Sequence, residues 1–126
     1  MNGISKMFFL TGAVFALVGM GWGIHMSASQ DHLMAPAHGH LNLIGFVAMS
    51  VFGTFYALAP SAAGRLALFH YLLTVAAVIV LIPGIAMAIS GSGEVLAKIG
   101  SVLAILSMAV FGLVVLRSPV ASSTSS

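Results

Sequence analysis

The sequence predicts an all-α integral membrane protein, a bundle of four transmembrane helices. Its composition is the first observation: 60% of the 126 residues are hydrophobic and only 5% are charged, against about 25% charged residues in soluble domains. Four basic and two acidic side chains cannot give a soluble fold a polar surface. The second observation is four apolar stretches, each near the ~20 residues that cross a bilayer as a helix. One membrane domain over residues 1–118 is therefore expected.

The first helix is expected over residues 7–26. A basic residue, an apolar run and small residues before a polar loop also resemble a secretory signal peptide, which is the alternative interpretation. The apolar run from Phe8 to Ile24 is longer than the ~7 to 15 residues of a usual signal core. Gly19 and Gly23 also form a small-xxx-small pair that suits helix packing. We therefore expect this helix to be retained.

The other three helices are expected over residues 38–59, 65–89 and 94–117. The breaks "PSAAG" and "SGSGE" between them are rich in turn residues. Because these connections are short, neighbouring helices should pack antiparallel. Residues 119–126, rich in serine, are expected to form a disordered tail.

The positive charges predict the orientation. If the helices alternate in direction, Lys6, Arg65 and Arg117 share one side, and that side is cytoplasmic by the positive-inside rule. Both termini are therefore expected in the cytoplasm. Lys98 falls on the outer side, where its side chain can snorkel to the interface. The net charge of +2 comes from dispersed residues, so no nucleic-acid partner is expected.

Histidine is the residue type that points to chemistry here. The chain has no cysteine, so any metal or heme must be held by His, Met or oxygen ligands. Four of the five histidines gather on the outer side: His25 ends the first helix, His32 lies in the loop, and His38 and His40 open the second helix. Ionisable groups inside a membrane are functional candidates. His32 lies in a polar loop and is expected to contact water.

The spacing of His38 and His40 separates their directions. Two residues apart on a helix differ by about 200° in azimuth, so the imidazoles point to nearly opposite faces. Such a pair suits two sites on two flanks better than one chelated ion, for which an i, i+4 spacing is typical. Pro36 marks the start of the helix. An irregular start that turns His38 toward the same site is the alternative.

The segment "AHGHLNLIGFVAMSVFGTFYALAP", from Ala37 to Pro60, resembles a heme-bearing helix of subunit I of the heme-copper oxidases and nitric oxide reductases. The second helix of the reductases carries a similar series of residues, matched here by His40, Asn42, Gly53, Tyr56 and Pro60. In that family the histidine of this series binds low-spin heme. The resemblance implies the same role for His40.

A second version of the resemblance involves both histidines. The tenth helix of the oxidases carries a His-x-His, whose first histidine binds the high-spin heme and whose second binds the low-spin heme; His38 and His40 match them. The whole chain also resembles short four-helix bacterial proteins often labelled as oxidase-like. The resemblance implies a heme b protein of the bacterial inner membrane, active in electron transfer, heme handling or diatomic-gas sensing with an unknown redox partner.

Subunit I of the family has twelve helices in three arcs of four, related by a pseudo-threefold axis. A chain with one arc implies a homotrimer, with a heme between His38 of one copy and His40 of the next. The acidic residues of the family's proton pathways are largely missing, and Asp31 and Glu94 lie at loops. No catalytic set is therefore predicted, and any enzymatic activity would be that of an oxidoreductase of this superfamily.

Two other functions stay open. The first is an outer-face copper site made by His38 or His40 of several copies, with His25, since imidazoles suit copper. Thioethers near these histidines could complete it, namely those of Met20, Met26 and Met34. The second is an accessory or assembly subunit without a metal, whose histidines only cap helices and donate hydrogen bonds.

His70 needs a separate interpretation, because it lies near the cytoplasmic end of the third helix. We expect a polar packing contact with Tyr71, Thr74 or Arg65. A heme ligand on the inner side is the alternative. Asn42 could orient a ligand by a hydrogen bond. Tyr56 is expected to bridge helices.

Overall fold

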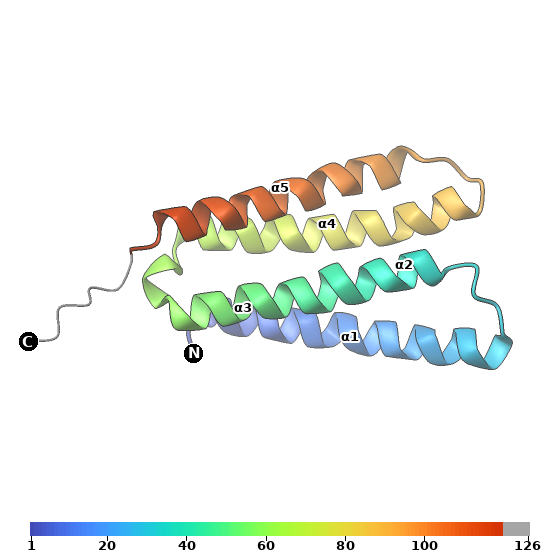
Figure 1. Cartoon of the computed structure of the whole chain (residues 1–126), viewed down its shortest axis with the longest axis horizontal. Helices are drawn as coiled ribbons and strands as arrows, with labels where there is room; N and C mark the ends of the chain where they lie inside the picture. Colours follow the sequence, from blue (N-terminus) through green and yellow to red (C-terminus); the bar gives the residue numbers. More distant parts are fainter. Residues whose placement is uncertain (120–126) are drawn as a thin grey trace, which may run out of the picture.

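The structure, a computed structural model, describes residues 1–119 and is helical nearly throughout them (Figure 1). Its elements are α1 (Gly3–Ser29), α2 (Ala35–His40), the π-helix η1 (Leu41–Ala48), α3 (Met49–Leu58), the 3-10 turn η2 (Pro60–Ala62), α4 (Arg65–Ile89) and α5 (Val95–Arg117). Because α2, η1 and α3 are continuous, we call them together the second helix. Within residues 1–119, four helices are thus long and apolar enough to cross a membrane, as predicted.

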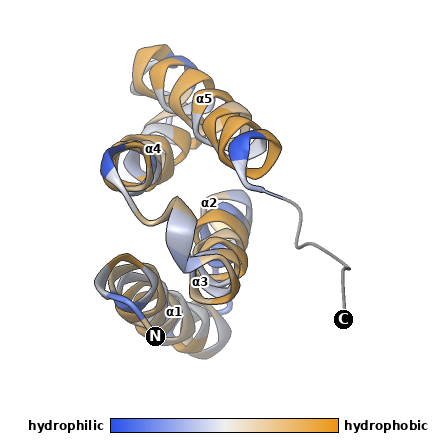
Figure 2. Ribbon diagram, turned by 90° about the vertical axis from the view of Figure 1, so that its left-hand side faces the viewer, coloured by the Kyte–Doolittle hydropathy of each residue, from blue (hydrophilic) through white to orange (hydrophobic). Residues whose placement is uncertain are grey.

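The helices follow one another in space as they do in sequence. The most extensive packing joins α4 to α5 and joins α1 to the second helix. Viewed along their axes, α1 and the second helix lie side by side as one pair, and α4 and α5 form a second pair above it (Figure 2). The chain starts and α5 finishes at the same end of the molecule (Figure 1). We call this the terminal end, and the opposite end, with the connections 30–34 and 90–94, the loop end.

The first helix is longer than expected at both ends. It begins at Gly3 because Asn2 caps it: the Ser5 backbone N–H donates to Asn2 Oδ1 over 2.9 Å. It ends at Ser29, where Gln30 takes a left-handed conformation with a φ of 56°. Hydropathy alone marks the membrane-crossing part of a helix, so these polar turns fell outside the expected range of 7–26.

The second helix also begins earlier than expected, at Ala35 rather than at residue 38. Pro36 occupies its first turn, where a missing backbone N–H costs nothing. His38 therefore lies inside regular α-helix, and the irregular start considered for it is wrong. The irregularity lies after the histidines, in the π-helix from Leu41 to Ala48. Such segments are frequently found at functional sites.

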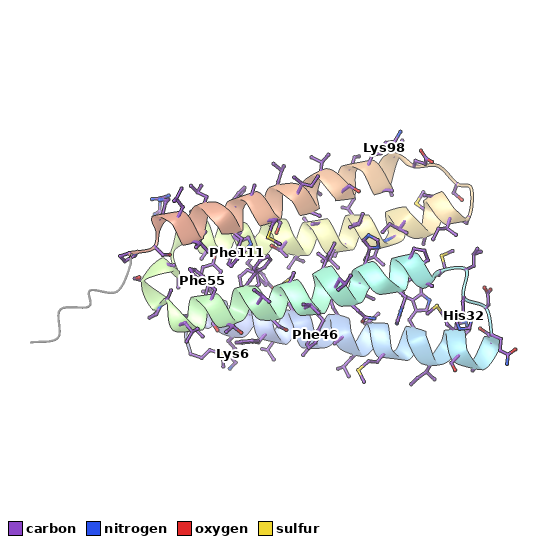
Figure 3. All side chains as sticks on the ribbon, viewed as in Figure 1. Lys6, His32, Phe46, Phe55, Lys98 and Phe111 are labelled. Carbon is purple, nitrogen blue, oxygen red and sulfur yellow. The ribbon has the colours of Figure 1, made fainter. Side chains whose placement is uncertain are left out.

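An aromatic core holds the helices together near the terminal end. Phe8 of α1 stacks on Tyr56 with ring centroids 5.5 Å apart. Phe55 and Phe111, labelled in Figure 3, join α3 to α5 with centroids 5.4 Å apart. In contrast, α1 exposes Leu10, Leu17 and Ile24, spaced seven apart, by 57–71%. Exposed apolar side chains in such a row suit contact with lipid.

Glycines set how closely the helices approach. A Cβ at Gly84 of α4 would lie 2.5 Å from the backbone nitrogen of Ala97. A Cβ at Gly100 of α5 would lie 2.5 Å from Leu81 Cα. These two helices therefore touch backbone to backbone, a contact that only glycine permits. The tail expected over residues 119–126 lies, apart from Pro119, outside the described residues.

Candidate metal-ligating site at the loop end

His40 is the more accessible of the two histidines in α2. Its side chain is exposed, and its Nδ1 lies 2.7 Å from the carbonyl oxygen of Pro36, one turn earlier. A carbonyl oxygen only accepts hydrogen bonds, so Nδ1 carries the proton and donates it. In the neutral imidazole Nε2 then keeps its lone pair. The helix thus presents a fixed tautomer with a free nitrogen outside the helix packing.

His38 is turned toward α1. Its Nε2 lies 2.9 Å from the carbonyl oxygen of Gly19 and 3.2 Å from the amide nitrogen of Asn42. With a proton on Nε2, the ring donates to Gly19; with a proton on Nδ1 instead, Nε2 accepts from Asn42. In either tautomer Nε2 makes a hydrogen bond within the chain, so only Nδ1 is left to bind a ligand.

Two glycines of α1 make room for this contact. A Cβ at Gly23 would lie 3.2 Å from His38 Nε2, and one at Gly19 would collide with Asn42 Oδ1. Trp22 meets the His38 ring edge to face, with centroids 6.2 Å apart. The small-xxx-small pair predicted in the first helix, Gly19 and Gly23, therefore leaves space for the side chains of His38 and Asn42.

The two imidazoles lie in different surroundings, as their azimuths predict. His38 is half-buried between the two helices and His40 is exposed. His25 is exposed on α1, and His32 is exposed in the connection between α1 and α2 (Figure 3). The expectation that His32 contacts water agrees with its exposure.

The structure does not bring these histidines together into a multidentate site within one copy. Among residues 1–119, no three His, Asp or Glu side chains are grouped so that they could hold a metal ion. The three methionines also differ in placement: Met20 is 65% exposed, Met26 is buried, and Met34 is half-buried before α2.

A shallow apolar groove follows His40 along the second helix. It has a volume of about 330 Å³ and is lined by Phe46, Val47, Ser50, Val51 and Thr54. The Thr54 hydroxyl donates to the Ser50 carbonyl oxygen over 2.8 Å, so it adds little polarity to the groove. Phe46, labelled in Figure 3, lies midway along the helix. An exposed imidazole and an apolar groove thus occur on the same helix.

His70 lies toward the other end of the molecule and is fully buried in α4. The Tyr56 hydroxyl is 2.9 Å from His70 Nδ1, which confirms the expectation that Tyr56 bridges helices. Thr74, one of the three expected partners, donates to the backbone carbonyl oxygen of His70 over 2.7 Å rather than to its imidazole, and contacts Ser107 of α5. Tyr71 instead bonds to Thr11, with 2.6 Å between the hydroxyl oxygens.

The remaining nitrogen of His70 has no protein partner. Its Nε2 is buried without a hydrogen bond in the described part of the chain. The imidazole is surrounded by rings of Phe8, Phe52 and Phe111, with centroids 5.3, 4.4 and 5.8 Å away. The aromatic rings leave the His70 imidazole no exposed surface, whereas the His40 side chain is exposed.

The charges divide between the two ends. The helix bounds place Lys6, Arg65 and Arg117 at the terminal end, and Lys98 at the loop end. Lys98 pairs with Glu94 over 3.8 Å, and both side chains are more than 70% exposed. Such a pair contributes little to stability.

Sequence reasoning missed two features of the site. One is the Pro36 carbonyl that orients His40, which the i, i+4 spacing of Pro36 and His40 could have indicated. The other is the π-helix after the histidines, for which the apolar pattern gives no signal.

Comparisons with protein-family models, characterised proteins and solved structures give no significant match to this chain.

Proposed function

We propose that this chain is a b-type heme-binding integral membrane protein in which His40 is an axial ligand of the iron. One observation carries the proposal: His40 is exposed, and its Nδ1 donates to the Pro36 carbonyl over 2.7 Å. Histidines that bind metals usually donate the other ring N–H to a carbonyl or carboxylate, which fixes the tautomer and raises the basicity of the ligand. His40 has this arrangement before any ligand arrives.

The donor set of the chain suits heme better than a protein-ligated ion. Heme iron needs only one or two axial ligands from the protein, because the macrocycle supplies the others. The exposed imidazole of His40 meets that requirement, whereas an ion without a macrocycle needs three or four protein ligands. The apolar groove beyond His40, lined by Phe46, Val47 and Val51 among others, supplies surface for an apolar ring.

His38 has a different role in this proposal. Because its Nε2 is held by Gly19 or Asn42, we assign it to packing of the second helix against α1. The packing fixes the rotation of α2 about its axis and thereby the direction of His40. The role of a second heme ligand, which the oxidase resemblance implies for His38, would have to use Nδ1.

Bound heme would supply one-electron redox chemistry or a site for a diatomic gas. The chain's own residues would hold the iron at His40 and exclude water with the apolar side chains. We propose electron transfer, heme handling or gas sensing as the cellular role. The only acidic residues are Asp31 and Glu94, so no proton-coupled catalysis is assigned to this chain.

The proposal includes an assembly and an orientation. The exposed His40 leaves one face of a heme for a second copy to cover. The resemblance to one arc of the twelve-helix subunit I supports a homotrimer. The three cations at the terminal end support cytoplasmic termini. The family resemblance supports a bacterial inner membrane as the location.

A reduced-minus-oxidised absorption spectrum of protein from heme-replete cells tests the proposal. We expect a Soret band and an alpha band in the unmodified chain, and the loss of both in His40→Ala. His32→Ala, also exposed at the loop end, is the matched control and should keep them. A bandless protein that contains copper would favour the copper site. A protein with neither would favour the accessory subunit.

A further inference from the structure

A cavity lies at the terminal end, between the start of α4 and the end of α5. It has a volume of about 580 Å³, within the usual range of ligand sites. Its lining includes Ser61, Gly64, Arg65, Val114, Arg117 and Ser118. Figure 2 looks onto this end and shows hydrophilic stretches at the beginning of α4 and the end of α5. The cavity is at the opposite end from His40 and is independent of the proposed heme site.

The two arginines of this cavity have no acidic side chain near them. The sequence contains only two acidic residues, Asp31 and Glu94. Both lie in connections at the loop end, a full helix length away, which is on the order of 30 Å. No carboxylate side chain of the chain can therefore neutralise Arg65 and Arg117. Two uncompensated cations beside one cavity attract an anion.

The depth of the cavity in the membrane indicates which anion is available. Arg65 begins α4 and Arg117 ends α5, so both lie where the apolar spans finish. This is the level of the lipid headgroups. Phosphate is the abundant anion there, and the planar guanidinium binds it through two parallel hydrogen bonds. Basic pockets between membrane helices are known to take acidic headgroups.

The lining also has an apolar side, which favours a lipid over a free ion. Leu66 and Val114 line the cavity together with the arginines. Nearby on the same two helices, Leu68 is 46% and Leu116 is 82% exposed. We propose that this cavity binds the phosphate group of an anionic glycerophospholipid between Arg65 and Arg117. The acyl chains then follow the exposed apolar side chains of α4 and α5.

Native mass spectrometry of the purified chain in detergent, with added phosphatidylglycerol or phosphatidylcholine, tests the proposal. We expect a preference for phosphatidylglycerol. Arg65→Gln and Arg117→Gln should each weaken its binding about fivefold, and the double variant about twenty-five-fold, from roughly 1 kcal/mol for each cation near a charged surface. Lys98→Gln removes an exposed cation at the loop end and is the matched control, with no expected change.

Three results would overturn the proposal. One is an equal loss in Lys98→Gln, which would indicate only general charge attraction. Another is equal binding of both lipids by the unmodified chain, a result that needs no variant to fold. The third is displacement of the lipid by millimolar inorganic phosphate, which would assign the site to a free anion. The elution profile of each variant checks its folding. The double variant Arg65→Lys with Arg117→Lys keeps both positive charges but removes both guanidinium groups, so it separates the effect of charge from that of guanidinium geometry.

Discussion

His40 and His70 are the same residue type in opposite surroundings. His40, at the loop end, is exposed and has one ring nitrogen bonded to the carbonyl of its own helix. His70, toward the terminal end, is fully buried, bonds to Tyr56 of another helix, and is enclosed by aromatic rings. A buried imidazole with a cross-helix partner holds helices together. An exposed imidazole with a fixed tautomer is available for a ligand.

Accessibility and the hydrogen-bond partner of each ring nitrogen, rather than the presence of histidine, distinguish an imidazole that is available for a ligand from one that serves packing. His38 lies between the two cases, because it is half-buried and its Nε2 is held inside the chain. Variants that change stability at one end and ligand binding at the other test this division.

The largest loss of stability is expected for His70→Ala. The substitution leaves a cavity among aromatic rings and removes the partner of the Tyr56 hydroxyl, which together should lower the free energy of unfolding by about 2–4 kcal/mol. Unfolding by sodium dodecyl sulfate in mixed micelles measures it. His32→Ala is the control and should change the value by less than about 0.5 kcal/mol. Equal values for the two variants would refute the packing role of His70.

A smaller loss is expected for Gly19→Ala. The added Cβ would collide with the Asn42 side chain beside His38, and such overpacking costs about 1–3 kcal/mol. The matched control is Gly21→Ala on the same helix, because a Cβ there meets no atom within 4 Å. The same unfolding titration compares them. A neutral effect at Gly19 would mean that α1 and the second helix are not packed as described.

Tyr56→Phe should cost less again. It removes the hydroxyl that bonds His70 but keeps the ring stacked on Phe8. Hydrogen bonds between membrane helices contribute about 0.6 kcal/mol on average and at most about 1.7. A double-mutant cycle with His70→Ala isolates the pair. If the two effects simply add, the bond between the side chains contributes nothing.

The smallest effect is expected for Glu94→Gln at the loop end. The substitution removes the exposed ion pair with Lys98, and pairs of this i, i+4 kind contribute about 0.3–0.5 kcal/mol. A higher salt concentration should reduce the difference from the unmodified chain, as seen by repeating the titration at two ionic strengths. A loss above about 1 kcal/mol would point to a further role of Glu94.

The sequence was informative about the helices because lipid imposes a simple rule. A membrane-spanning segment must be long and apolar, and four such stretches are visible in the sequence. The opposite directions of His38 and His40 followed from helix geometry. The ends of α1 were less predictable, because Asn2 and Gln30 extend it by local capping that hydropathy does not record.

Contacts between helices were harder to predict. Tyr56 was expected to bridge helices, but its partner His70 was assigned to neighbours on its own helix, because a sequence pattern shows which residues share a helix and not which helices meet. The π-helix from Leu41 to Ala48 changes the rotation of the second helix and has no signal in an apolar segment. The tautomer of His40 depends on its contact with the Pro36 carbonyl, for which the i, i+4 spacing of the two residues is the only sequence signal.

The most direct test of the division between the two ends is the heme content per chain in the unmodified protein, in His40→Ala and in His70→Ala. Protein from heme-replete cells is purified in one detergent, and its heme is quantified as the pyridine complex. We expect His40→Ala to lose heme but keep its resistance to unfolding, and His70→Ala to unfold more easily but keep its heme. Full heme content in His40→Ala would contradict it.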